Sequence, residues 1–198
     1  YVNNDFLREL KGLKLRVKVL DIQSKVLYDS EISFDIQANS AKKVLEMPKI
    51  KELTSTYFVD LRLFDATGKQ IENNFYWLST VADVPDFEKT TWYWTPNSQF
   101  ADFKALNTMP KAEVDFRALK SERQGSNYLI KADLMNPSQA LAFFIELQLV
   151  DQRTGEPVLP VFWDDNYVSL LPGESRVLTA KIAADGLDSQ FLKVEMQG

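Results

Sequence analysis

The feature that most constrains the fold is a two-residue alternation of apolar and polar side chains. In the segment GLKLRVKVLD, Leu13, Leu15, Val17 and Val19 alternate with lysines and an arginine. Because successive side chains of a β-strand point to opposite faces, this pattern predicts a strand with one buried and one solvated face. The segments VLYDSEISFDI and TYFVDLRLFD repeat the pattern, and the turn ATGK follows the second of them. The first half of the chain is therefore predicted to be antiparallel β-structure.

The second half of the chain repeats this style. Apolar residues alternate from Tyr128 to Leu134 before the turn NPS, and from Phe143 to Leu149 before the turn RTG. The layout also repeats, since FDIQANSAKKVLEM in the first half resembles VSLLPGESRVLTAK in the second. Short strands at this spacing are typical of immunoglobulin-like sandwiches. We therefore expect an all-β chain with two tandem immunoglobulin-like antiparallel β-sandwiches, at residues 1–90 and 111–198.

Residues 91–110 are expected to join the sandwiches as an ordered, aromatic-rich linker. The wider segment 80–110 is longer than most loops and is not rich in glycine and serine, which argues against a flexible tether. The motif TPNS is typical of a helix start, and the apolar residues after it have the spacing of one short helical turn. We predict that five apolar residues pack this linker across both domains, with an aromatic platform for sugar as the alternative: Trp92, Trp94, Phe100, Phe103 and Leu106.

Tyr57 lies where immunoglobulin-like folds carry a tyrosine corner, a phenol that bonds to upstream backbone. We therefore predict that the Tyr57 hydroxyl bonds to the backbone near Leu53. Its counterpart in the second half, Phe191, lacks the hydroxyl.

The composition excludes several kinds of active site. The chain contains no histidine and no cysteine, which removes Ser-His-Asp and Cys-His nucleophiles, His/Cys zinc sites and redox dithiols. A formal net charge of −5 argues against nucleic-acid binding, which needs a basic face. No apolar run approaches the roughly 18 residues of a membrane helix. We expect no cofactor, although carboxylate-only metal sites and paired-carboxylate hydrolysis remain open.

The segment FWDDNY holds the densest group of candidate site residues. Trp163, Asp164, Asp165 and Asn166 could contact a sugar, hold a calcium ion or contact another domain. The spacing and central glycine of an EF-hand are absent, which makes calcium the weaker hypothesis. Aspartate and asparagine tolerate turn conformations and bond to their own backbone. A structural turn is therefore the favoured interpretation, and sugar or interdomain contact is the alternative.

Four motifs resemble, in order, the C-terminal region of family 2 glycoside hydrolases. They are NNFYWLS, TPNSQFADFKALNTMP, AFFIELQL and VLPVFWDDNYVSLLPGESR. The most similar type is the exo-β-D-glucosaminidase and endo-β-mannosidase branch, in which this region forms two immunoglobulin-like sandwiches after a TIM-barrel catalytic domain. The resemblance implies an accessory region of a retaining hydrolase that acts on a β-linked glucosaminide or mannoside. It also implies a bacterial protein that is periplasmic or secreted.

The same resemblance implies that the catalytic residues lie outside this sequence. Family members use two glutamates of the barrel, and neither matches a position here. Retention also needs two carboxyls about 5–5.5 Å apart, whereas Glu31, Glu46, Glu146 and Glu174 occur in patterns that direct them to water. We therefore expect no catalysis by this chain alone and a structural role beside the barrel of the same polypeptide. A pair of carbohydrate-binding modules, which would contact an oligosaccharide through exposed aromatics, is the alternative.

Overall fold

The structure is a computed structural model that describes residues 1–118 and 121–198. It is built from β-strands and three short 3-10 helices within these ranges, so the predicted all-β class is confirmed. The chain divides into two compact units, which we call the first domain (Tyr1–Met109) and the second domain (Pro110–Gly198). No helix in the described part of the chain is long and apolar enough to cross a membrane.

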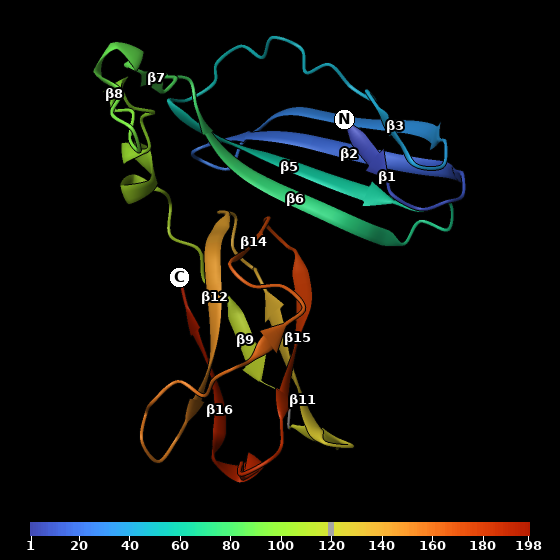
Figure 1. Ribbon diagram of the computed structural model, residues 1–198, viewed down its shortest axis with the longest axis vertical. Helices are drawn as coiled ribbons and strands as arrows, with labels where there is room; N and C mark the ends of the chain where they lie inside the picture. Colours follow the sequence, from blue (N-terminus) through green and yellow to red (C-terminus); the bar gives the residue numbers. More distant parts are fainter. Residues whose placement is uncertain (119–120) are drawn as a thin grey trace. The chain divides into compact units, whose positions relative to one another are not determined.

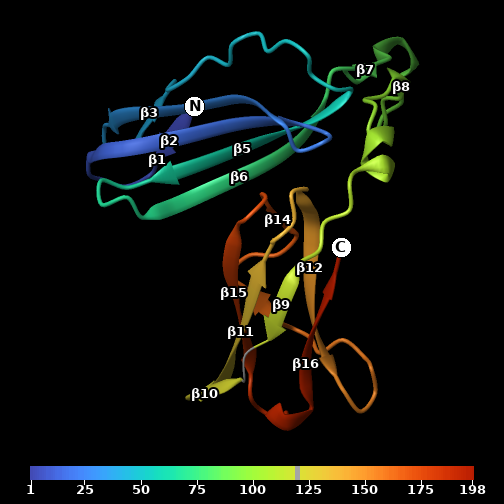
Figure 2. The ribbon, with the colours of Figure 1, turned by 180° about the vertical axis from the view of Figure 1, so that it is seen from behind.

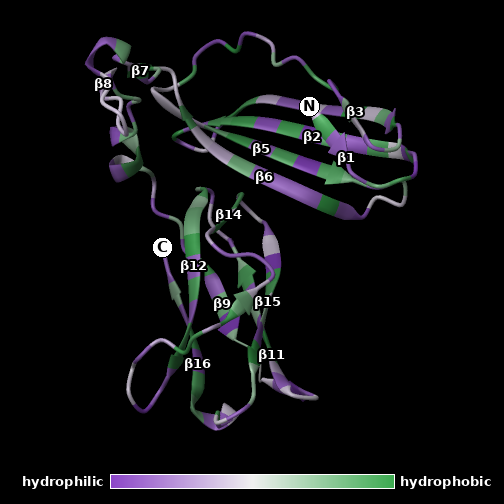
Figure 3. Cartoon of the chain, viewed as in Figure 1, coloured by the Kyte–Doolittle hydropathy of each residue, from purple (hydrophilic) through white to green (hydrophobic). Residues whose placement is uncertain are grey.

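The first domain is built on a four-stranded antiparallel sheet in the order β3-β2-β5-β6 (Figure 1). These strands are β2 (Leu10–Asp21), β3 (Val26–Ile36), β5 (Thr56–Phe64) and β6 (Gln70–Ser79). Hydrophilic and hydrophobic bands alternate along them (Figure 3). Leu13, Val17 and Val19, all predicted to face inward, are buried. A smaller sheet pairs β1 (Val2–Asn4) with β4 (Ser40–Lys42).

Aspartates fix the tight turns that connect these strands. In the turn after β5, Asp65 Oδ1 accepts the backbone N–H groups of Thr67 at 2.8 Å and Lys69 at 3.0 Å. Gly68 adopts a φ of 84°, a left-handed conformation that glycine reaches without strain. The turn motif read from the sequence therefore acts through side-chain bonds to its own backbone.

Residues 81–109, including most of the predicted linker, belong to the first domain. They contain β7 (Val84–Pro85), η1 (Phe87–Lys89), β8 (Asn97–Gln99) and η2 (Lys104–Thr108). The predicted short helical turn is present as η2, but it begins at Lys104, because TPNS itself leads into β8, which pairs with β7. The segment is tied to the main sheet, since Thr56 Oγ1 donates to the carbonyl of Asp102 at 2.9 Å.

The second domain is a β-sandwich of two sheets (Figure 2). One sheet has the order β10-β11-β15-β13, with β9 also paired to β11, and the other has the order β14-β12-β16. The elements are β9 (Asp115–Ala118), β10 (Glu122–Gln124), β11 (Asn127–Met135), β12 (Ala142–Asp151), β13 (Phe162–Trp163), β14 (Val168–Leu170), β15 (Ser175–Ala183), η3 (Ser189–Phe191) and β16 (Leu192–Gln197).

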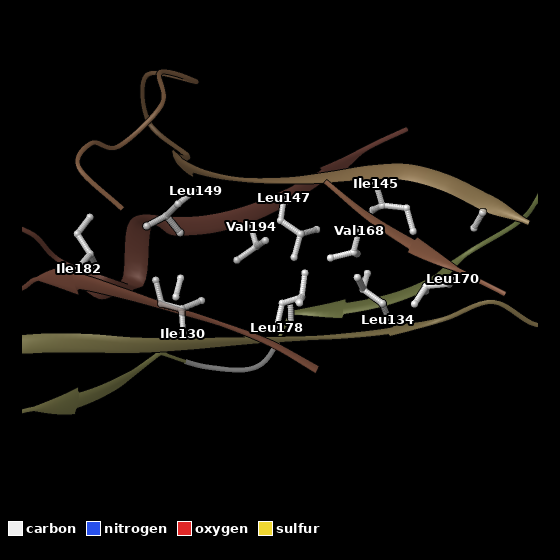
Figure 4. Packing of buried hydrophobic residues seen from close by; sticks show 13 residues of the cluster. Ile130, Leu134, Ile145, Leu147, Leu149, Val168, Leu170, Leu178, Ile182 and Val194 are labelled. Carbon is white, nitrogen blue, oxygen red and sulfur yellow. The ribbon is translucent and has the colours of Figure 1, made fainter. Parts of the chain in front are cut away.

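The core of the second domain lies between these two sheets (Figure 4). Leu147 and Val194 come from one sheet, and Ile130 and Leu178 come from the other; all four are buried. Their side chains point toward one another from facing strands, as the alternation in β11, β12 and β15 predicts. The two layers thus meet through closely packed aliphatic groups.

Asn4 is a buried polar residue of the first domain that the sequence analysis did not identify. Its Nδ2 donates to the carbonyls of Arg8 at 2.9 Å and Gln37 at 2.8 Å. Its Oδ1 accepts the backbone N–H of Phe6 at 3.1 Å. The amide therefore fixes a local turn and also joins it to a segment more than thirty residues away.

Asn136 makes the same set of contacts in the second domain and is also buried. Its Nδ2 donates to the carbonyls of Ala140 at 2.8 Å and Leu170 at 2.9 Å. Its Oδ1 accepts the backbone N–H of Ser138 at 3.1 Å. We call this shared arrangement, in Asn4 and in Asn136, the asparagine clamp.

Candidate functional site

The FWDDNY segment connects β13 to β14 in the second domain. Trp163 lies in β13 opposite Ala180 of β15, and its ring is partly buried against the core of the sandwich. A sugar-stacking residue presents its flat face to solvent, so the partial burial of Trp163 favours a structural role, and sugar contact stays an untested alternative. Its neighbour Phe162 points the other way and is exposed.

Asp164 and Asp165 are both used in contacts within the domain. The backbone N–H of Asp164 donates to the carbonyl of Thr179 at 2.8 Å, and Asp164 Oδ1 accepts the N–H of Thr179 at 2.8 Å. Asp165 accepts the N–H of Asn166 at 2.8 Å and forms an ion pair with Arg176. The two carboxylates therefore extend the edge of β15 and fasten the turn to it.

Asn166 continues the pairing on the other side of the turn. Its Oδ1 accepts the N–H of Leu147 at 2.8 Å, and its Nδ2 donates to the carbonyl of the same residue at 2.9 Å. The side chain thus imitates a neighbouring strand and satisfies both backbone groups of Leu147. Within residues 1–118 and 121–198, no three acidic side chains form a group that could hold a metal ion. The contacts of this segment are those of a structural turn.

Tyr167, Glu146 and Phe144 form a surface cluster beside this turn that was not predicted from the sequence. Tyr167 donates its hydroxyl to Glu146 Oε1 at 3.0 Å, and its ring centroid lies 5.1 Å from that of Phe144. The carboxylate raises the pKa of the Tyr167 phenol, because the hydrogen bond favours the neutral form. Phe144 and Tyr167 both have positive φ values, 61° and 55°, which is rare for aromatic residues. The alternation in β12 did not reveal this pair, because its register with β14 shifts at Phe144.

The glutamates considered for acid–base chemistry each have a structural partner. Glu31 accepts hydrogen bonds from Lys14 and Arg16, each at 3.1 Å, and these cations lower its pKa. A general acid needs a pKa raised toward neutrality, so Glu31 is shifted in the opposite direction. Glu46 pairs with Lys43, and the remaining two, Glu146 and Glu174, accept a tyrosine hydroxyl and a backbone N–H.

The residues predicted to pack the linker divide into two groups. Phe103 and Leu106 are partly buried, next to and within η2. Trp92, Trp94 and Phe100 are exposed, Trp92 at 93%, so the first domain does not bury them, and packing of these rings across both domains stays a prediction. The reason is local: backbone bonds fold residues 84–99 back on themselves, including Asp86 N to Pro96 O at 2.8 Å. The rings therefore project from this fold.

The predicted tyrosine corner is also corrected. Among the described residues, the Tyr57 hydroxyl makes no hydrogen bond to the backbone near Leu53. Thr54 makes the corner contact instead, since its Oγ1 accepts the N–H of Ile22 at 3.1 Å and donates to the carbonyl of Thr56. A threonine hydroxyl next to the backbone closes this bend without a phenol.

Comparison with protein families agrees with this architecture. Residues 92–198 match the family model described as the exo-beta-D-glucosaminidase Ig-fold domain, which covers more than half of the chain. The chain belongs to this family. Residues 1–83 match the mannosidase Ig/CBM-like domain. The predicted pair of immunoglobulin-like domains and the resemblance to family 2 exo-β-D-glucosaminidases are both confirmed, and both family models describe Ig-like domains rather than a catalytic domain.

Several exo-beta-D-glucosaminidases contain a region similar to this Ig-fold pair. That of Amycolatopsis orientalis is 33% identical over all of this chain and 19% of its own length. That of Hypocrea jecorina is 31% identical over all of this chain and 22% of its own length. The chain thus spans about a fifth of these curated relatives.

Solved structures give the same result. The crystal structure of the exo-chitosanase CsxA from Amycolatopsis orientalis superposes with a TM-score of 0.91 at 33% identity. The match covers 100% of this chain and 24% of that one. A beta-D-mannosidase from Dictyoglomus thermophilum, at 18% identity and a TM-score of 0.56, shares the fold alone.

Proposed function

We propose that this chain is a non-catalytic accessory region of a retaining family 2 glycoside hydrolase that acts on a β-linked glucosaminide or mannoside. The observation that carries the proposal is the full-length superposition on one part of an exo-chitosanase, with a TM-score of 0.91. The glucosaminide is the favoured substrate of the parent enzyme, because five relatives of this chain are exo-beta-D-glucosaminidases.

The contacts of the acidic side chains support a structural role. A retaining glycosidase needs a nucleophile and an acid whose pKa is raised by its surroundings. Here Glu31 is held by two cations that lower its pKa, and Asp165 is fixed by Arg176. Asp164 is bonded to the backbone of β15. These carboxylates stabilise the sandwiches and leave the chemistry to another domain.

The partner in this proposal is a TIM-barrel catalytic domain of the same polypeptide. The accessory domains would stabilise that barrel and shape the edge of its cleft. The parent enzyme would be periplasmic or secreted, because a polysaccharide substrate is met outside the cytoplasm.

A carbohydrate-binding pair is the second candidate, and one observation favours it. Residues 1–83 match a model described as Ig/CBM-like, so the first domain shares its architecture with sugar-binding modules. Such modules stack exposed aromatic rings on sugars and bond hydroxyls with carboxylates or amides. Trp163 and Asn166, the residues first considered for that role, are used within the second domain.

Two measurements test the proposal. The parent polypeptide should hydrolyse an aryl-β-glucosaminide. Absence of this activity in folded parent protein would contradict the assignment to a hydrolase. Calorimetric titration of the 198-residue chain with chito- and manno-oligosaccharides should show no binding at submillimolar concentration. Submillimolar affinity that is abolished by Trp163→Ala would favour the carbohydrate-binding candidate.

A further inference from the structure

Residues 84–100 present a group of aromatic side chains that the first domain does not cover. We call this group the aromatic tip. Its members are all exposed: Phe87, Trp92, Tyr93, Trp94 and Phe100. Soluble proteins rarely leave so many large apolar groups of one short segment in water, and exposed apolar groups of this kind mark interaction sites.

The backbone that carries the aromatic tip is held in one conformation by hydrogen bonds. Asp83 Oδ1 accepts from the side chain of Asn97 at 3.2 Å and from the N–H of Ala101 at 2.9 Å. Gln99 Nε2 donates to the carbonyl of Ala82 at 2.7 Å, closing the base of the segment. A surface that is ordered before it binds loses little conformational entropy on association. This favours a built interface over a flexible loop.

We propose that the aromatic tip docks on a protein surface of the catalytic domain of the same parent polypeptide. This inference rests on the function proposed above. The chain covers only 24% of CsxA and 19% of the related glucosaminidase, so most of such an enzyme lies outside it. The match to the glucosaminidase Ig-fold family begins at residue 92 and includes four of the five rings.

The size of the aromatic tip fits a protein interface. Aromatic side chains bury roughly 150–250 Å² each, so five largely exposed rings could cover on the order of 700 Å². A standard interface buries about 800 Å² on each partner, and tryptophan and tyrosine are enriched at its centre. The aromatic tip could therefore form most of one side of such an interface.

The geometry favours protein over sugar as the occupant. The rings of Trp92 and Tyr93 meet edge to face, at 71° with centroids 4.8 Å apart, so this pair presents no flat platform. Asp86, a carboxylate of the same segment, already pairs with Lys89 at 2.7 Å. The threonine hydroxyls at positions 90 and 95 lie 3.1 Å apart and bond to each other. Sugar recognition would need free carboxylates and hydroxyls to bond the sugar hydroxyls, whereas a protein surface can pack against the rings alone.

Hydroxyl-radical footprinting tests this inference directly. The modification rates of Trp92, Tyr93 and Phe100 would be compared between the 198-residue chain and the full-length parent. We expect each rate to fall at least about five-fold in the parent, because the core of an interface excludes water. Phe162, whose 70% exposure equals that of Phe100, is the internal control and should keep its rate.

Other outcomes would overturn the inference. Equal rates in the chain and in the parent would show that the aromatic tip is free. Protection that requires added glucosamine oligosaccharide would make it a sugar site, and concentration-dependent protection of the isolated chain would make it a self-association site. Footprinting does not depend on turnover, so a hydrolytically active parent with an unprotected tip would refute this inference and leave the proposed function standing.

Substitution gives a second readout. Trp92→Ala should leave the melting temperature of the 198-residue chain unchanged, because the ring contributes little burial there. In the parent it should lower the melting temperature, whereas Phe162→Ala should not. A Trp92→Ala parent that melts with the wild type would contradict docking.

Discussion

The two domains share the asparagine clamp but enclose their cores differently. In the second domain, two sheets of hydrogen-bonded strands face each other across a continuous aliphatic core. In the first domain, the four-stranded sheet is faced by the short β1–β4 pair and by residues 43–55, which contain no strand. The asparagine clamp is therefore present in both domains, whereas a second sheet of three strands is present only in the second domain among the described residues.

An open pocket in the first domain follows from this difference. It has a volume of about 350 Å³ and lies between the sheet, at Val17 and Leu61, and the strandless segment, at Val44 and Met47. Close packing makes a core sensitive to the loss of single methylene groups, whereas an open site loses fewer contacts. The comparison implies that the second domain depends on its core more strongly than the first.

The largest expected effect breaks the core of the second domain. Leu147→Ala removes a buried side chain between two sheets and should lower the free energy of unfolding by about 3–5 kcal/mol. In the first domain, Leu61→Ala affects a partly buried residue that lines the pocket and should cost only about 1–2 kcal/mol, because less apolar surface returns to water. Urea unfolding of both variants measures the difference. Equal losses would show that the first domain is packed as tightly as the second.

The asparagine clamp should matter about equally in both domains. Asn136→Ala leaves the carbonyls of Ala140 and Leu170 without these side-chain donors and should cost about 2–3 kcal/mol. Asn4→Ala should cost a similar amount for the same reason. The exposed Asn107→Ala is the control and should have no measurable effect. A clear loss of unfolding free energy in Asn136→Ala with none in Asn4→Ala would show that the two clamps share a geometry but do not contribute equally to stability.

The corner of the first domain should depend on Thr54 and not on Tyr57. Thr54→Val removes a hydroxyl that bonds two backbone groups and should cost about 1 kcal/mol. Tyr57→Phe should change the unfolding free energy by less than about 0.5 kcal/mol. Thermal unfolding of the two variants decides the question, and the reverse order of effects would restore the tyrosine corner.

The smallest expected effect concerns the turns after β2 and β12, where Asp21 and Asp151 each accept the backbone N–H of the residue two positions further on. Arg153 holds the pKa of Asp151 at about 2, below its ordinary value of 3.8. Because the folded pKa is lowered, the stabilisation is present above pH 3.8 and is lost as the pH falls toward 2. Asp151→Asn should therefore flatten the pH dependence of the second domain's melting temperature in this range. An unchanged slope would show that other carboxylates govern acid unfolding.

The strand pattern was predictable, because alternation in β2, β3, β11 and β15 depends only on which face is buried. The asparagine clamp was not predictable, because its amides bond to carbonyls of segments more than thirty residues away. The turn at Asp164 could be anticipated, since aspartates favour such conformations, although its partner Thr179 could not.

The errors have a common physical cause. Trp92 was expected to pack the linker across both domains, yet the first domain leaves its ring exposed, because residues 84–99 fold on themselves. Tyr57 was assigned from its position in the repeat, but a nearby hydroxyl at Thr54 makes the contact. Local sequence pattern predicts the strands and turns, whereas the partner that a side chain contacts depends on which segments the fold brings together.

The most direct test of the account is turnover of an aryl-β-D-glucosaminide by the purified 198-residue chain. We expect a rate equal to that of buffer, with the chain folded by circular dichroism. We also expect Glu31→Gln and Asp165→Asn to leave that rate unchanged, because their carboxylates pair with cations of the fold. Turnover above background that is lost in either variant would contradict the central claim that these domains are non-catalytic.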